Sequence, residues 1–505
     1  MVTKLFNEDQ CANAEVEMTL IFSCPLEALS AKCLDITPFA TPKRFRFFSV
    51  DSILDPNSPR LDIFESAKLP PQPLHFLVPH GEHSQSSYCA VSYVWKGIND
   101  DDTLRRKYSS YYDSCFSVKG AEDADPISIQ ILRDIAWAAR NFRKEDVHYT
   151  EKCRTNNVKF IWLDRISMMQ TSKEDKVWQI TKMFLVYNTS ISLVLPGGLQ
   201  RLVGIDESTS WVDRAWTLQE ALAPDRYDVY VLWKPSSGQP VELGECTFPK
   251  DKCGVCVIQD RHHRTLCHLN VLLTRNERES LFGWSRIHTS ELQQRLKSNL
   301  AGHQSIWRSS IMRTSSRPVD MVFSIMHFQY ADLDPHKFCE DDRIGALIAL
   351  CQREEHVQKM EWFFALFFLP PSSDYSIFPL LPKTTVGGEA TWDMPDGSIR
   401  VIKDYCAGPP GELPFLDIMV SVNCKEFHLD DNGYIHMKVV LYPLHRSLPP
   451  TSVPKAEEAT LEWSKDCSST IALTIHDVIQ DVYWTIPTVG APTALNLNNG
   501  YFTFT

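Results

Sequence analysis

Short apolar runs alternate with amphipathic helical patterns between residues 88 and 233. The runs at 88–95, 159–164, 190–196 and 227–233 are rich in β-branched and aromatic residues, which is typical of strands. Residues 127–142 and 171–187 carry apolar side chains at helical spacing, and a third helical segment, 211–224, ends at a proline. Apolar strands that alternate with helices predict a parallel sheet with helices on both faces.

The remainder of the chain predicts further regions around this α/β pattern. A length of 505 residues is too great for one ordinary hydrophobic core, so we expect more than one domain. Residues 1–85 are interpreted as an N-terminal extension that ends in a proline-rich connector, and residues 86–235 as the α/β domain. Residues 236–505 are expected to form a C-terminal region, helical to about 366 and then β-rich.

Charge and composition narrow the class of protein. Lys+Arg 51 against Asp+Glu 63 gives a net charge of −12 without a basic stripe, so we expect no nucleic-acid partner. The longest strongly apolar run, 362–369, is less than half the length of a membrane helix, so we expect no membrane partner. The first residues are acidic, unlike a secretion signal, and fifteen scattered cysteines fit reduced thiols. These observations predict a cytoplasmic protein.

A cluster of cysteines and histidines lies between residues 246 and 268 and includes a pair with the spacing of metal ligands. Cys253 and Cys256 are two residues apart, and such paired thiolates can hold one side of a tetrahedral zinc ion. The spacing of the other members is irregular, however, and Cys267 and His268 are adjacent, which is awkward for binding one ion. Free thiols in a connecting segment are the favoured interpretation, and we expect no bound metal.

Polar and aromatic side chains gather at or just beyond the predicted strand ends. In open α/β sheets, ligands bind outside the carboxyl ends of the strands. Asp213, Trp216 and Glu220 are also spaced to share one face of the third helix. Each residue alone has a structural explanation, such as a turn cap, a core aromatic or a surface charge, but their convergence on one edge favours a site. The candidates are Ser92, Tyr93, Trp95, Asp164, Gln170, Arg214, Trp216 and Glu220.

The same segments resemble the HET (heterokaryon incompatibility) domain of fungal proteins. The resemblance rests on AVSYVW, IWLDRISMMQTSKEDKVWQITKMFLVY, LVLPGGL and WVDRAWTLQEALAP, in this order across about residues 86–235. Two positions depart from the family pattern. Lys96 separates Trp95 from Gly97, and Ser167 stands where the family usually has cysteine, which removes any thiol nucleophile there.

The resemblance implies a flavodoxin-like fold and a role in non-self recognition and cell-death signalling. HET domains are similar in outline to TIR domains, some of which cleave NAD⁺ with a glutamate that resembles Glu220. One hypothesis is therefore catalysis by Glu220 and Asp164 on NAD⁺ or a related nucleotide, with the other six candidates binding the ligand. The other is a non-catalytic adaptor that self-associates and recruits signalling proteins. No bound cofactor is expected in either case, and NAD⁺ enters as a substrate.

Overall fold

The computed structural model describes most of the chain up to residue 352 and isolated strands beyond it. The described ranges are 17–70, 88–98, 102–144, 154–155, 158–224, 228–235, 257–260 and 264–276, shorter pieces between 281 and 352, and parts of 383–503. The chain divides into two compact units, 1–297 and 298–505. All candidate site residues belong to the first unit.

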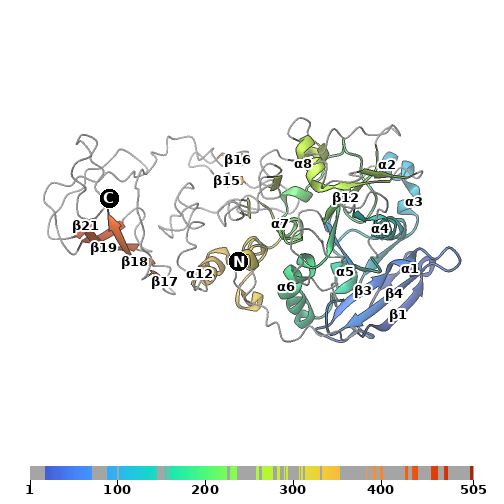
Figure 1. Cartoon of the computed structure of the whole chain (residues 1–505), viewed down its shortest axis with the longest axis horizontal. Helices are drawn as coiled ribbons and strands as arrows, with labels where there is room; N and C mark the ends of the chain where they lie inside the picture. Colours follow the sequence, from blue (N-terminus) through green and yellow to red (C-terminus); the bar gives the residue numbers. More distant parts are fainter. Residues whose placement is uncertain are drawn as a thin grey trace. The chain divides into compact units, whose positions relative to one another are not determined.

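The first unit is built on a nine-stranded mixed sheet (Figure 1). Its strand order is β1-β4-β3-β10-β5-β11-β12-β14-β13. The four strands β10, β5, β11 and β12 pair in parallel, and the strands on either side of them pair antiparallel. The bounds are β1 (Thr19–Pro25), β3 (Phe45–Ser49), β4 (Arg60–Ser66), β5 (Tyr88–Tyr93), β10 (Phe160–Trp162), β11 (Ile191–Leu195), β12 (Val229–Trp233), β13 (Val257–Gln259) and β14 (Thr265–His268).

The parallel strands lie in the middle of the core. Every residue of β5, β11 and β12 is buried, so both faces of these strands are covered. Such strands read as continuous apolar runs rather than as an alternating pattern. The four strands predicted from the sequence are confirmed, each shorter than predicted by two or three residues.

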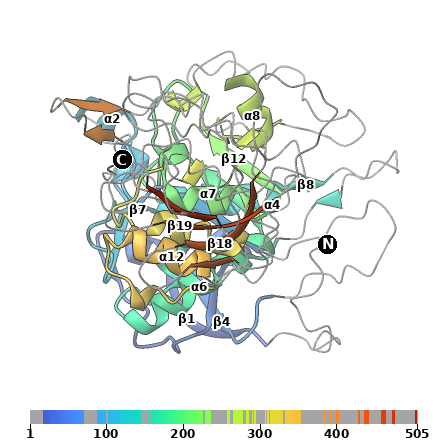
Figure 2. The ribbon, with the colours of Figure 1, turned by 90° about the vertical axis from the view of Figure 1, so that its left-hand side faces the viewer.

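Helices cover the two faces of this sheet. On one face, Cys89, Val91 and Tyr93 belong to the same core cluster as the buried side of α4 (Ile129–Asn141). On the other, the rings of Trp162 and Tyr187 meet edge to face at 5.7 Å, which packs α6 (Lys173–Asn188) against β10. Figures 1 and 2 both show β1 and β4 toward one end of this unit and α8 (Leu269–Asn276) toward the other.

All three predicted helices begin two to four residues later than expected, at Ile129, Lys173 and Ala215. Ser172 caps α6, because its Oγ accepts the N–H of Asp175 at 3.2 Å. Thr171 shares a hydrogen bond of 2.6 Å with Thr37. The third predicted helix is divided: η3 (Trp211–Asp213) is a 3₁₀ turn, Arg214 is extended, and α7 (Ala215–Leu222) follows.

The sheet continues past both boundaries expected from the sequence. Strand β3 pairs with β10, and the side chains of Phe47 and Phe48 on β3 are fully buried. Strand β14 pairs with β12 at the opposite side. Residues 19–66 and 257–268 therefore contribute strands to the same sheet as the predicted α/β domain.

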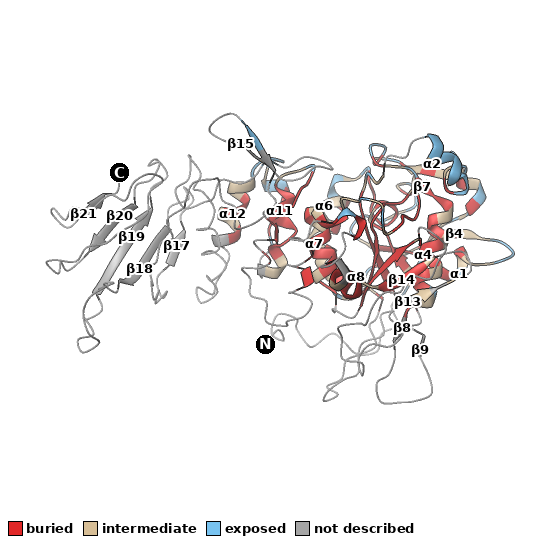
Figure 3. Ribbon diagram, turned by 90° about the horizontal axis from the view of Figure 1, so that it is seen from above, coloured by how far each residue is buried: buried red, intermediate tan, exposed pale blue. Residues whose placement is uncertain are grey.

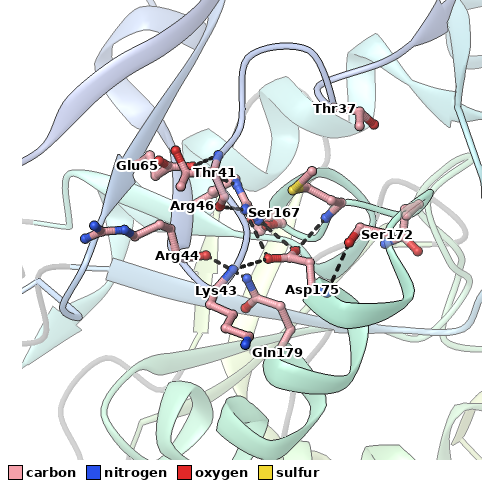
Figure 4. Close-up of polar contacts among 12 residues, drawn as sticks. Thr37, Thr41, Lys43, Arg44, Arg46, Glu65, Ser167, Ser172, Asp175 and Gln179 are labelled. Atoms are coloured by element: carbon pink, nitrogen blue, oxygen red, sulfur yellow. Dashed lines mark hydrogen bonds and ion pairs between the residues drawn. The ribbon is translucent and has the colours of Figure 1, made fainter.

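An ion pair inside the first unit joins β3 to α6 (Figure 4). Both side chains of the pair, Arg46 and Asp175, are completely buried. Arg46 donates to both oxygens of the Asp175 carboxylate, at 2.9 and 3.1 Å, and also to Glu65 and to the backbone of Ser167. The N-terminal strands are thus fastened to the helix by hydrogen bonds as well as by strand pairing.

Smaller elements complete the first unit. A three-stranded sheet contains β2 (Cys33–Leu34), β6 (Cys115–Val118) and β7 (Ile127–Ser128). The strands β8 (Arg143–Lys144) and β9 (Arg154–Thr155) form a separate pair. The short helices are α1 (Val50–Ile53), α2 (Asp102–Lys107), α3 (Ser109–Tyr112) and α5 (Asp164–Ser167).

In the second unit, two described helices come before the described strands. The helices are α11 (Asp320–Phe323) and α12 (Arg343–Gln352), and β15 (Thr391–Asp393) pairs with β16 (Ile399–Val401). An antiparallel sheet follows, with β17 (Phe427–Leu429), β18 (Ile435–Leu441), β19 (Glu457–Trp463), β20 (Ile471–Ile475) and β21 (Tyr501–Thr503) in sequence order. Within the described residues, no helix combines the length and apolarity needed to cross a membrane. The apolar run 362–369 lies outside those residues.

Candidate functional site

Asp164 is held in a fixed orientation at the end of β10. Tyr93 Oη donates to its Oδ1 at 2.5 Å, and Trp95 Nε1 donates to its Oδ2 at 3.1 Å. The backbone N–H of Arg165 donates to Oδ1 at 2.6 Å. Burial raises the pKa of Asp164, although these donors oppose the rise. The side chain is half-buried, so an oriented carboxylate lies at the surface of the core.

Gln170 and Ser167 support the turn that follows Asp164. Gln170 Nε2 donates to the backbone oxygen of Asp164 at 3.0 Å. The buried Oγ of Ser167 accepts the N–H of Leu163 at 3.1 Å and so closes the turn of α5. Ser167, which replaces the usual cysteine, therefore has a structural partner, and Gln170 binds the backbone of this turn.

Glu220 lies on α7 beneath a short hydrogen-bonded chain. Ser92 Oγ donates to its Oε2 at 2.5 Å, and Trp211 Nε1 donates to that Oγ at 2.8 Å. Ser192 Oγ donates to the backbone oxygen of Glu220 at 3.0 Å. Glu220 is only 7% exposed, and burial raises its pKa to about 8. Its carboxyl group is therefore mostly protonated at pH 7.

The candidate residues form two clusters rather than one face. Neighbouring side chains of a strand point to opposite faces of the sheet, so Ser92 and Tyr93 diverge. Ser92 reaches Glu220 on α7, and Tyr93, whose ring belongs to the core cluster on the α4 face, reaches Asp164. The clusters still influence each other, because the charge of Asp164 contributes to the raised pKa of Glu220.

The residues around Glu220 differ from the predicted helical face. Asp213 lies in η3, outside α7, so the expected shared face of Asp213, Trp216 and Glu220 is wrong. Arg214 is near enough that its charge opposes the rise in the pKa of Glu220. Trp216 is half-buried on α7. Trp211, which the sequence placed only in a helical pattern, is the partner that was missed, and a buried indole N–H that needs an acceptor was its only signal.

The comparison with known families matches the segment that contains Asp164 and its hydrogen-bond partners. Residues 88–198 match the family model described as Heterokaryon incompatibility protein (HET). The chain carries a HET domain. The match includes Ser92, Tyr93, Trp95, Asp164 and Gln170 and ends before α7, so Arg214, Trp216 and Glu220 lie beyond it. No curated protein and no solved structure matches the chain.

Two loops of the HET domain meet at the strand ends. A Cβ atom on Gly97 would lie 2.0 Å from the backbone oxygen of Gly197, and Gly198 has a φ of +85°, which favours glycine. The backbones that follow β5 and β11 are therefore in direct contact. Gly97 also donates its N–H to Asp125 Oδ2 at 2.5 Å. Lys96 is exposed, so the extra residue leaves these backbone contacts of Gly97 in place.

The candidate zinc cluster lies mostly outside the described residues. Cys246, Cys253 and Cys256 fall there, and Cys267 and His268 lie on β14. Cys267 is fully buried and its pKa is raised to about 12, while the His268 ring stacks on Tyr230 at 4.1 Å. Within the described part of the chain, no group of three or more His, Cys, Asp or Glu side chains is arranged to hold a metal ion.

Proposed function

We propose that the protein acts in heterokaryon-incompatibility signalling and triggers cell death through cleavage of NAD⁺ or a related nucleotide. The HET domain implies the incompatibility-type function. The cell-death outcome rests on the resemblance to HET domains, and the substrate rests on the resemblance to TIR domains and on the two carboxyl clusters at the end of β5. The observation that carries the proposal is the Asp164 carboxylate, half-buried and held by three donors.

The topology supports a ligand site at this edge. In sequence order, the four parallel strands occupy the spatial order second, first, third and fourth. This is the beginning of the flavodoxin-like order, in which the ligand lies at the carboxyl end of the first strand. Strand β5 is that strand here, and Ser92 and Tyr93 stand at its carboxyl end.

The chemistry proposed for the site uses both carboxyl groups. When the ribosyl–nicotinamide bond breaks, its electron pair leaves with nicotinamide and positive charge develops on the ribose, as in glycoside hydrolysis. An oriented Asp164 carboxylate stabilises this charge. Water then adds to the ribosyl carbon, and its proton goes to Glu220 in its ionised form, which a pKa of about 8 makes the minority form at pH 7 and an increasing fraction as pH rises toward 8.

A non-catalytic adaptor is the second candidate function. The observation that favours it is the burial of Glu220, whose hydrogen bond to Ser92 also fits a purely structural role. In that case the HET domain would signal through self-association and protein partners. Consumption of NAD⁺ separates the two functions.

The decisive experiment follows NAD⁺ and viability together in cells that express the chain. We expect NAD⁺ to fall before viability does, and purified protein to release nicotinamide. Asp164→Asn and Glu220→Gln should each lower the rate by a factor on the order of 10²–10³, typical for removal of one electrostatic group. Glu174→Gln, which changes an exposed carboxylate on α6, is the matched control and should behave as wild type. Cell death at constant NAD⁺ would contradict the enzymatic proposal and support the adaptor.

A further inference from the structure

Three cationic side chains surround the ring of Tyr108. The guanidinium carbon of Arg201 lies 4.5 Å from the ring centroid, and the ammonium nitrogens of Lys234 and Lys107 lie 5.0 and 5.2 Å from it. Cation–π attraction holds each cation near the ring, but the cations also repel one another. A cluster of this kind needs negative charge nearby.

The cluster is assembled from segments that follow three adjacent parallel strands. Lys107 ends α2, in the connection after β5, and Tyr108 follows it. Arg201 lies in the segment after β11, and Lys234 directly follows β12. A parallel bridge between Gly204 and Lys234 and a backbone hydrogen bond from Lys234 to Val203 of 2.8 Å fix the two latter segments together. The cluster therefore occupies the carboxyl edge of the sheet, where α/β folds bind ligands.

The carboxylates within reach leave part of this positive charge uncompensated. Glu207 accepts from both terminal nitrogens of Arg201, at 3.0 and 2.5 Å, and thus neutralises that side chain. Asp134 also attracts Lys234 but forms an ion pair of 3.3 Å with Arg264. Lys107 and Lys234 make no ion pair within the described residues.

The surroundings of Lys234 disfavour its charged form. Burial lowers the pKa of Lys234, the charges of Asp134 and Glu207 oppose the fall, and the charges of Lys107 and Arg201 add to it. Its side chain is half-buried, so water screens the charge incompletely. Lys107 and the rest of α2 remain exposed or half-exposed, which leaves the cluster open to a ligand from that side (Figure 3).

We infer that Lys107, Lys234 and the Tyr108 ring form a binding site for the phosphate groups of a small phosphorylated ligand. A phosphate oxygen accepts charge-assisted hydrogen bonds from ammonium groups and removes the repulsion between them. The cluster offers two cations beyond the neutralised Arg201, on a chain of net charge −12, which fits a small ligand rather than a long polyanion. This inference goes beyond the proposed cleavage of NAD⁺ and does not depend on it.

Calorimetric titration of the full chain with inorganic pyrophosphate tests the site. We expect saturable binding to the wild type and a loss of roughly tenfold in affinity for Lys234→Met or Lys107→Met, the size of one charge-assisted hydrogen bond. Lys173→Met removes an equal charge from the exposed surface of α6 and should bind as wild type does. No saturable binding by the wild type, or an equal loss in the Lys173 control, would overturn the inference.

Thermal unfolding shows whether these variants are still folded. Without pyrophosphate, Lys234→Met should melt at or above the wild-type temperature, because a half-buried cation among like charges is removed. With pyrophosphate, the wild type should gain thermal stability and Lys234→Met should gain little. An equal gain by both proteins would refute the site. Asp164→Asn should keep wild-type pyrophosphate affinity, so a failure of the proposed NAD⁺ cleavage leaves a separate, readable result for this site.

Discussion

Burial decides the protonation of Glu220, and that has a measurable effect on stability. Its pKa is about 8 in the folded protein and near 4.5 in the unfolded chain. Between these values the folded state holds one more proton than the unfolded state, so this group lowers stability as pH rises from about 5 to 8. The protonated Glu220 makes its full contribution to the free energy of unfolding below pH 4.5, the pKa in the unfolded chain. This contribution is lost as pH rises from there to about 8.

Glu220→Gln should remove this pH dependence, because an amide does not ionise. We expect the variant to gain stability relative to the wild type as pH rises from 5 to 8, by on the order of a few kcal/mol in total. Urea unfolding at pH 5, 6, 7 and 8 measures the difference. If the free energies of unfolding of the two proteins change with pH in the same way, Glu220 is not buried in a neutral form.

Asp164→Asn keeps the size of the side chain at the end of β10 but removes its negative charge. The amide keeps one acceptor but turns an N–H donor toward either the backbone N–H of Arg165 or Trp95 Nε1, which costs about 1–3 kcal/mol for the unmatched group. We expect a lower melting temperature together with loss of NAD⁺ cleavage.

Ser167→Ala supplies the control for that experiment, because it removes a hydrogen bond from the same turn and leaves the carboxylate unchanged. Ser167→Ala should lower the free energy of unfolding by about 1 kcal/mol and should still cleave NAD⁺. If nicotinamide release by the two variants falls in proportion to their melting temperatures, Asp164 acts only through the fold.

At the scale of elements, one buried ion pair joins the N-terminal strands to α6. The carboxylate of Asp175 accepts from Arg46 and from the backbone N–H groups of Lys43 and Met169, at 2.8 and 2.9 Å (Figure 4). Arg46 also donates to Glu65 on β4 at 3.2 Å. Strands β3 and β4, helix α6 and the turn before it thus share one network.

Asp175→Asn should therefore be strongly destabilising. It leaves the buried Arg46 charge without its main partner, which typically costs about 3–5 kcal/mol. Glu174→Gln, one residue away, breaks an exposed pair with Lys43 and should cost at most about 1 kcal/mol. Chemical denaturation measures the free energy of unfolding of both variants. An equal decrease in the two would show that the buried network contributes little to stability.

At the scale of the molecule, the HET segment depends on strands outside its own sequence. The family match begins at residue 88 and ends at 198, but β10 needs β3 as a neighbour and β11 needs β12. A chain cut to residues 86–235 would lose β1, β3 and β4 and expose the edge of β10. Such an exposed edge invites aggregation.

We expect the 86–235 fragment to aggregate and the 1–297 unit to fold cooperatively. Size-exclusion chromatography and thermal unfolding of both fragments test this. A monomeric 86–235 fragment with a sharp melting transition would show that the N-terminal strands are dispensable.

The sequence alone predicted the α/β fold class and the parallel strands, because these strands are buried on both faces and their local apolar pattern reports it. It also brought Asp164, Tyr93 and Trp95 to one strand edge, since parallel strands share that edge. Only the tertiary structure assigned β3 to the same sheet, paired Arg46 with Asp175 over 129 positions, and set Trp211 beside Ser92. It also buried Glu220 and so raised its pKa. These outcomes depend on contacts between distant residues, and no local pattern of side chains records which distant partner will cover a given group.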